Sequence, residues 1–191
     1  MKSLKPFIFG ILAAAGALII ELVISNLYFI LSGKDVEINY FDKITFFLVI
    51  VVLIEESFKY VMLRKSYKEQ DRKKQKISTA VIAGLGFASV ELFFIYLSMF
   101  FNQSSFYFDL GIIGALALHI ATTGIIGYLI VSEKSAGTSL AIKTIGIAFC
   151  LHIIYNLAII YNLNYLVIYS YLIALFLVLV LLSHKYAEKN P

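Results

Sequence analysis

The sequence Ile54-Glu55-Glu56-Ser57-Phe58-Lys59 places three charged residues inside a largely apolar run that extends from Ile44 to Leu63. A charged side chain at the centre of a bilayer costs roughly 2.5–3.5 kcal/mol on insertion scales, so membrane helices keep such residues mainly where they face a bundle interior. On a helix, Lys59 lies within one turn of both glutamates and can pair with either. The glutamates themselves point about 100° apart, so one can act while the other braces the site. A buried ion pair that only sets the register of the helix would show the same pattern.

The composition of the whole chain predicts an integral membrane protein. Of its 191 residues, 61% are hydrophobic and 15% are charged, and the mean hydropathy is +0.89. This chain is too apolar for a soluble core and too short for several domains, so we expect residues 1–191 to form a single membrane domain. The net charge of +4 does not indicate a nucleic-acid partner, because the basic residues lie in short segments beside apolar runs. The single cysteine, Cys150, excludes an internal disulfide.

Long apolar segments predict an all-α bundle of about six transmembrane helices. We expect these helices at residues 6–31, 42–64, 77–101, 107–131, 140–161 and 164–183, with a basic loop at residues 65–76 between the second and the third. If the N-terminus is cytoplasmic, all but Lys34, Lys43 and Lys59 of the sixteen basic residues fall on the cytoplasmic side. This asymmetry predicts that both termini are cytoplasmic. The abundance of Ile, Lys, Asn, Tyr and Phe is typical of AT-rich microbial genomes, so we expect a multi-pass protein of the bacterial plasma membrane.

Further polar residues lie deep in the third, fourth and fifth predicted helices. They are Glu91 in the third helix, His119 and Thr123 in the fourth, and His152 and Asn156 in the fifth. Residues four apart share one face of a helix. At 1.5 Å per residue from each cytoplasmic end, Glu55 lies about 12 Å deep and Glu91, His119 and His152 lie about 18–21 Å deep. Four helices that each offer a glutamate or a histidine at compatible depths predict one shared polar site at mid-membrane.

Two other features of the apolar segments have structural interpretations. Glu21 lies within the first predicted helix, and because no other charged residue lies within one turn of it, we interpret it as a structural or water-facing carboxylate. Gly84 and Gly86 are interpreted as positions where two helices approach closely. A phosphate-binding loop is not expected there, because no strand precedes these glycines.

The polar motifs, taken together, resemble those of the PrsW-type intramembrane proteases, within the wider clan of CAAX prenyl proteases and bacteriocin-processing (Abi) membrane proteins. In chain order on successive helices, they are Glu55-Glu56-x-x-Lys59, Phe87-x-x-x-Glu91, His119-x-x-x-Thr123 and His152-x-x-x-Asn156. The resemblance covers residues 43–161. It implies glutamate-dependent hydrolysis of a peptide bond within the membrane, and PrsW members cleave membrane-tethered anti-sigma factors. The CAAX branch has arginine in the first motif and histidine at the position of Glu91, so cleavage of prenylated proteins is not expected. Leu92 stands where many PrsW relatives have asparagine.

Amide hydrolysis itself requires an activated water, a stabilised oxyanion and a proton for the leaving amine. Because a nearby cation favours an ionised carboxylate, we predict that Glu55 is the general base and that Glu56 braces the site through Lys59. His119 and His152 can donate hydrogen bonds to the oxyanion or pass on a proton. The predicted catalytic residues are therefore Glu55, Glu56, Glu91, His119 and His152, supported by Lys59, Thr123 and Asn156.

We expect no cofactor, because the sequence contains no His-Glu-x-x-His zinc motif. Zinc held by a glutamate and two histidines from separate helices stays the alternative. The expected partners are a membrane-tethered protein substrate and the lipid bilayer, without nucleic acid. The same glutamates and histidines also fit an ion- or proton-coupled transporter, in which they would form a relay at the midplane. A third interpretation is a non-enzymatic membrane protein whose polar core is purely structural.

Overall fold

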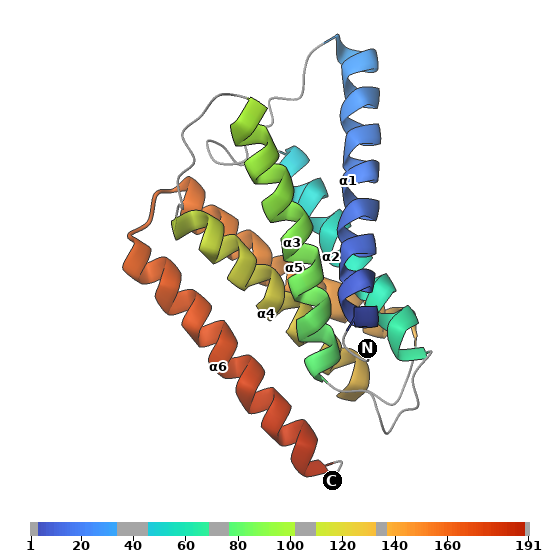
Figure 1. Ribbon diagram of the computed structural model, residues 1–191, viewed down its shortest axis with the longest axis vertical. Helices are drawn as coiled ribbons and strands as arrows, with labels where there is room; N and C mark the ends of the chain where they lie inside the picture. Colours follow the sequence, from blue (N-terminus) through green and yellow to red (C-terminus); the bar gives the residue numbers. More distant parts are fainter. Residues whose placement is uncertain (1–3, 34–45, 69–76, 102–109, 133–136, 190–191) are drawn as a thin grey trace.

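The chain folds into a bundle of α-helices. The computed structural model describes residues 4–33, 46–68, 77–101, 110–132 and 137–189, and within these ranges it contains six helices and no strand (Figure 1). The helices are α1 (Leu4–Ser32), α2 (Phe46–Lys68), α3 (Ile77–Phe101), α4 (Leu110–Ser132), α5 (Thr138–Ile160) and α6 (Tyr165–Lys189). The predicted all-α bundle is confirmed.

Two predicted boundaries are wrong by more than two residues. Helix α2 continues to Lys68, so residues 65–68 of the predicted basic loop are helical, and the basic side chains of this last turn complement the negative end of the helix dipole. Helix α6 continues to Lys189 instead of ending at Ser183. Neither glycine nor proline interrupts its polar end, where Glu188 Oε1 lies 3.2 Å from His184 Nδ1 one turn away. Three other predictions concern residues outside the described ranges. They are the start of the second helix at residue 42, the start of the fourth helix at residue 107, and the loop at residues 69–76.

Five of the six described helices are long and apolar enough to cross a membrane, which fits a multi-pass membrane protein. Helix α2 is the exception, because Glu55, Glu56 and Lys59 all lie within its apolar part. It is packed against α1, α4 and α5, so the bundle buries Glu56 and Lys59 fully and Glu55 in part. The beginning of α1 and the end of α6 lie at the same end of the bundle (Figure 1). Which side of the membrane this end faces stays a prediction.

Helix α3 lies between α1 and α4, and glycines bring these helices close together. A Cβ atom on Gly84 would lie 2.9 Å from the Cα atom of Ile120 in α4. A Cβ atom on Gly86 would overlap the carbonyl oxygen of Phe7 in α1. The interpretation of both glycines as positions of close helix approach is therefore confirmed. The close approach at Gly84 brings α3 next to the backbone of His119, which belongs to the predicted site.

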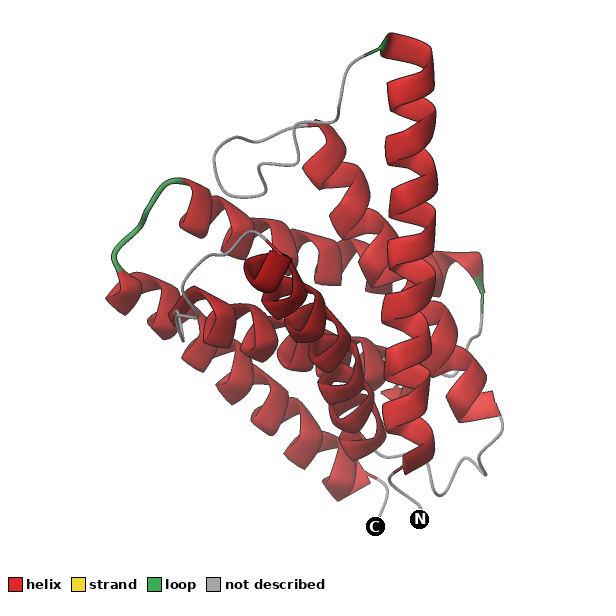
Figure 2. Cartoon of the chain, turned by 45° about the horizontal axis from the view of Figure 1, so that its top comes forward, coloured by secondary structure: helices red, strands yellow, loops and turns green. Residues whose placement is uncertain are grey.

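Helices α1 and α6 form the outer parts of the bundle. Helix α6 packs mainly against α4, and the hydroxyl of Tyr171 donates a 2.7 Å hydrogen bond to the carbonyl of Leu151 in α5. Helix α1 packs against α2 and α3 through its first half, where Gly10, Ala13, Ala14 and Ala17 are buried. Its second half extends past the neighbouring helices (Figure 2). Small side chains thus permit close packing along the first half alone.

Candidate active site

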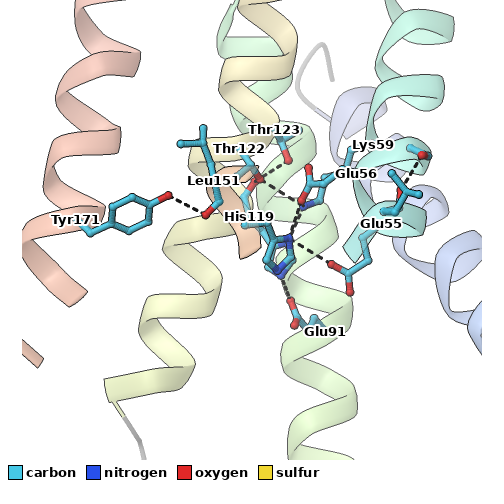
Figure 3. Close-up of polar contacts among 12 residues, drawn as sticks. Glu55, Glu56, Lys59, Glu91, His119, Thr122, Thr123, Leu151 and Tyr171 are labelled. Carbon is cyan, nitrogen blue, oxygen red and sulfur yellow. Dashed lines mark hydrogen bonds and ion pairs between the residues drawn. The ribbon is translucent and has the colours of Figure 1, made fainter. Parts of the chain in front are cut away.

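Four helices contribute to one polar cluster inside the bundle (Figure 3). All the predicted catalytic residues and Lys59 belong to it, and we call this group the Glu/His cluster. It consists of Glu55, Glu56 and Lys59 from α2, Glu91 from α3, His119 from α4 and His152 from α5. Tertiary packing therefore brings together residues that the sequence distributes over about a hundred positions.

Glu56 and Lys59 form the most deeply buried part of the Glu/His cluster. Lys59 Nζ donates 2.7 Å hydrogen bonds to Glu56 Oε1 and to His119 Nδ1, and His152 Nδ1 lies 2.7 Å from the same Glu56 oxygen. The exposed fraction is 1% for the Lys59 side chain and 0% for the Glu56 side chain. Because a carboxylate only accepts, the hydrogen of neutral His152 is on Nδ1, which leaves a lone pair on Nε2. Glu56 thus orients both the lysine and the histidine.

The ring of His119 is held on both nitrogens and on one face. An ammonium group only donates, so His119 Nδ1 accepts from Lys59 and Nε2 carries the hydrogen, which it donates to Glu91 Oε2. The Phe87 ring stacks on the imidazole at a centroid distance of 5.0 Å. Lys59 Nζ lies 4.5 Å from the centroid of the same phenyl ring, within the range of a cation–π contact. The first residue of the Phe87-x-x-x-Glu91 motif is therefore part of the site.

Glu55 differs from Glu56 in its contacts and in its accessibility. Its Oε2 atom lies 3.6 Å from His152 Nδ1, beyond hydrogen-bond distance, and has no hydrogen-bond partner among the described residues. The side chain of Glu55 is 15% exposed and that of Glu91 is 34% exposed, whereas the other members of the cluster are at most 5% exposed. The cluster therefore has a sealed end at Glu56 and Lys59 and an accessible end at Glu55 and Glu91.

Of the predicted supporting residues, Thr123 contacts the backbone of His119, whereas Asn156 does not bond to the cluster. The Thr123 hydroxyl donates a 2.6 Å hydrogen bond to the backbone carbonyl of His119, so Thr123 supports the helix that carries the histidine. Asn156 is partly exposed, and no hydrogen bond joins it to the described residues of the cluster. Sequence reasoning missed Thr122, a fully buried residue whose hydroxyl lies 3.4 Å from Lys59 Nζ. Its position three residues after His119, next to Thr123, was the available signal.

The Glu/His cluster fits a divalent metal ion by its donor chemistry. One donor atom from each of Glu55, Glu56, His119 and His152 can be chosen so that all lie within 4.8 Å of one another. The Oε2 atoms of Glu55 and Glu56 are buried without a hydrogen-bond partner among the described residues. In the cluster, three carboxylates face one ammonium group, so a divalent cation would balance their charge in an environment where net charge is costly. Lys59 competes for this position, because it already occupies His119 Nδ1 and Glu56 Oε1.

Comparisons with known proteins identify the family. Searches of curated proteins and of solved structures found no significant match. The family model described as PrsW family intramembrane metalloprotease matches residues 3–182. This match covers nearly the whole chain and extends beyond the expected 43–161 on both sides, so α1 and most of α6 belong to the family's common region. The chain therefore belongs to the PrsW family of intramembrane metalloproteases.

Proposed function

We propose that this protein hydrolyses a peptide bond of a membrane-associated protein, with Glu55 as the general base. Membership of the PrsW family implies a hydrolase that acts within the membrane. The observation that carries the assignment of the base is the Glu55 side chain, which is 15% exposed and whose Oε2 atom has no hydrogen-bond partner among the described residues. A general base needs an acceptor oxygen that water can reach, whereas the Glu56 side chain is fully buried and its Oε1 atom is engaged by Lys59 and His152.

The other residues of the cluster have complementary roles in this mechanism. Glu55 takes a proton from the attacking water. His152, held through Nδ1 by Glu56, has its Nε2 lone pair available to accept that proton and pass it to the leaving amine. The ammonium of Lys59 favours the negative charge that develops on the carbonyl oxygen. Glu91 acts as a positioning residue, because it accepts from His119 Nε2 and fixes the orientation of that ring.

A divalent metal, with zinc as the candidate, is included in this proposal. His119, His152 and Glu56 would hold the metal, since two histidines and a glutamate form a known catalytic zinc ligand set that leaves Glu55 free as the base. With a metal bound, Lys59 would no longer occupy His119 Nδ1, and Glu55 instead of His152 would pass the proton to the leaving amine, because the lone pair of His152 would be engaged. Bound zinc would supply Lewis-acid polarisation of the substrate carbonyl. This departs from the metal-free mechanism expected from the sequence, because the donor set and the family description both favour a metal. A metal-free mechanism is the second candidate, favoured by the contacts of Lys59 within the donor set.

The proposed substrate is a single-pass membrane protein, and anti-sigma factors of the bacterial plasma membrane are the class implied by the resemblance. The test uses the purified protein in liposomes with a panel of single-pass substrates. We expect cleavage at one site in at least one substrate and no ion or proton flux into the liposomes. A transporter would give the opposite result, because it would carry ions or protons and leave every substrate intact. That outcome would contradict the proposed hydrolysis.

Metal content provides a further prediction. We expect the purified protein to contain about one zinc ion per chain and to lose both zinc and activity on thorough chelation, with zinc alone restoring activity. His152→Ala should lose the metal because it removes a proposed ligand. His184→Ala is the matched control, since this histidine is 74% exposed at the end of α6. A chain that is free of metal and active after chelation would support the metal-free mechanism instead, with Lys59 as the cation of the site.

A further inference from the structure

We propose that Glu21 of α1 is a substrate-binding residue of this active site. Its carboxyl group accepts hydrogen bonds from backbone N–H groups of a substrate segment that has left its helical conformation. The inference rests on the proposed function, because it assigns a role in recognising the substrate of the same site. It adds a fifth helix to the four that carry the Glu/His cluster.

Glu21 lies where α1 separates from the bundle. It is 7% exposed, and it follows Gly10, Ala13, Ala14 and Ala17 on the face that packs against α2 and α3. It is also the last buried residue of α1, because every residue from Leu22 to Ser32 is partly or fully exposed. Beyond Glu21 only Ile24 and Ser25 are still partly buried, and the second half of the helix extends past its neighbours (Figure 2). This position is at the edge of the packed region.

Helix α1, which carries Glu21, packs against α2 and α3, the helices that carry Glu55 and Glu91. The carboxyl group of Glu21 interacts electrostatically with Glu91 and with Glu55, the two members of the cluster with the largest exposed fractions. Its Oε1 atom is buried and has no hydrogen-bond partner among the described residues. The sequence predicted that Glu21 is either a structural carboxylate or one that faces water. Its burial argues against the second of these interpretations. A buried carboxyl oxygen without a hydrogen-bond partner is costly, so the described contacts of Glu21 do not stabilise the fold through this oxygen. The unpaired oxygen instead needs a hydrogen-bond donor from a bound molecule.

The substrate backbone provides donors of the required kind. In a transmembrane helix every N–H group is bonded within the helix, and the scissile carbonyl is bonded as well. A water molecule can attack that carbonyl only after the segment has locally unwound. Unwinding leaves N–H groups unsatisfied in surroundings that contain little water, which is costly. An acceptor on a helix that packs against α2 would compensate for this loss when the scissile bond reaches Glu55. The carboxyl group of Glu21 can accept such bonds through either oxygen.

The test compares Glu21→Gln with Glu21→Leu in the liposome cleavage assay. Gln keeps an acceptor oxygen of similar shape, so we expect kcat/KM within about threefold of the unmodified protein. Leu removes the acceptor, so we expect kcat/KM to fall by about 10- to 100-fold, the range for leaving one buried donor unpaired. Leu22→Ala is the control, because Leu22 is the adjacent residue and is 62% exposed. We expect no change in that variant, and thermal unfolding should show that all three variants remain folded.

Substrate analogues separate hydrogen bonding from a structural role. In synthetic substrates, single amide bonds on either side of the scissile bond are replaced by esters, which removes one N–H donor at a time. At one of these positions, we expect the ester to weaken cleavage by the unmodified protein and to cause no further loss in Glu21→Leu. The inference would be overturned if every ester analogue lowered kcat/KM equally in the unmodified protein and in Glu21→Leu. It would also be overturned if Glu21→Gln lowered kcat/KM as much as Glu21→Leu does. Cleavage by Glu21→Leu at the normal rate would overturn this inference alone, whereas a wild-type chain that cleaves nothing would overturn the proposed function.

Discussion

Replacing Glu55 by Gln should lower kcat for peptide-bond cleavage by about 10²–10⁴, which corresponds to roughly 3–5 kcal/mol of activation free energy. Gln keeps the shape of the side chain and removes the proton acceptor. The melting temperature and substrate affinity should change little, because Glu55 Oε2 makes no hydrogen bond to a described residue that the substitution could break. Single-turnover cleavage rates and thermal unfolding in detergent micelles measure the two effects separately.

The matched control for Glu55→Gln is Glu188→Gln, the same substitution on a side chain that is 65% exposed at the end of α6. We expect the control to have the kinetic constants of the unmodified protein. Assignment of the base to Glu55 would be wrong if Glu55→Gln cleaved at the normal rate while a well-folded Glu56→Gln or Glu91→Gln variant were inactive. The class of enzyme would be unaffected by that result, since each of these carboxylates belongs to the same cluster.

Replacing Lys59 by Met should lower the free energy of unfolding by about 3–5 kcal/mol and should reduce activity as well. Lys59 and Glu56 are a buried ion pair, so removing the ammonium leaves an uncompensated carboxylate in the interior. Glu56→Gln should have a similar effect, because it leaves the ammonium without its carboxylate. The double variant should lose less stability than the sum of the two single losses, because neither charge is then left alone.

Thermal unfolding of the four proteins measures this coupling, and Lys185→Met, at an exposed lysine of α6, is the control for the loss of a positive charge. Strictly additive losses would show that Glu56 and Lys59 do not stabilise one another. The contrast with Glu55→Gln is the central expectation: one glutamate of the pair should affect catalysis alone, while its neighbour in sequence should affect both catalysis and folding. Their different contacts in the structure are the reason.

The observed ends of the helices show how accurately the local sequence predicts them. Apolar runs and their lengths predicted the helices to within one or two residues at most described ends, because the transfer of backbone and side chains into a bilayer depends on composition along the chain. The ends of α2 and α6 were predicted too early. An apolar run marks where a membrane would end, whereas each of these helices continues into polar residues that include no glycine or proline up to Lys68 and Lys189.

Sequence alone determined that the protein is a helical membrane bundle and which polar residues can form its site, because charges in apolar segments are visible without a fold. It also indicated where α3 can approach its neighbours, since Gly84 and Gly86 have no side chain. Only the tertiary structure decided that Glu56 is held by Lys59 and His152 while the Glu55 side chain stays partly exposed, and that Thr122 contacts Lys59. It also decided that Glu21 is buried with an oxygen that has no hydrogen-bond partner among the described residues. The physical reason is that these contacts depend on the rotation and crossing of whole helices. Those are set by packing between residues far apart in the sequence, and no local pattern records them.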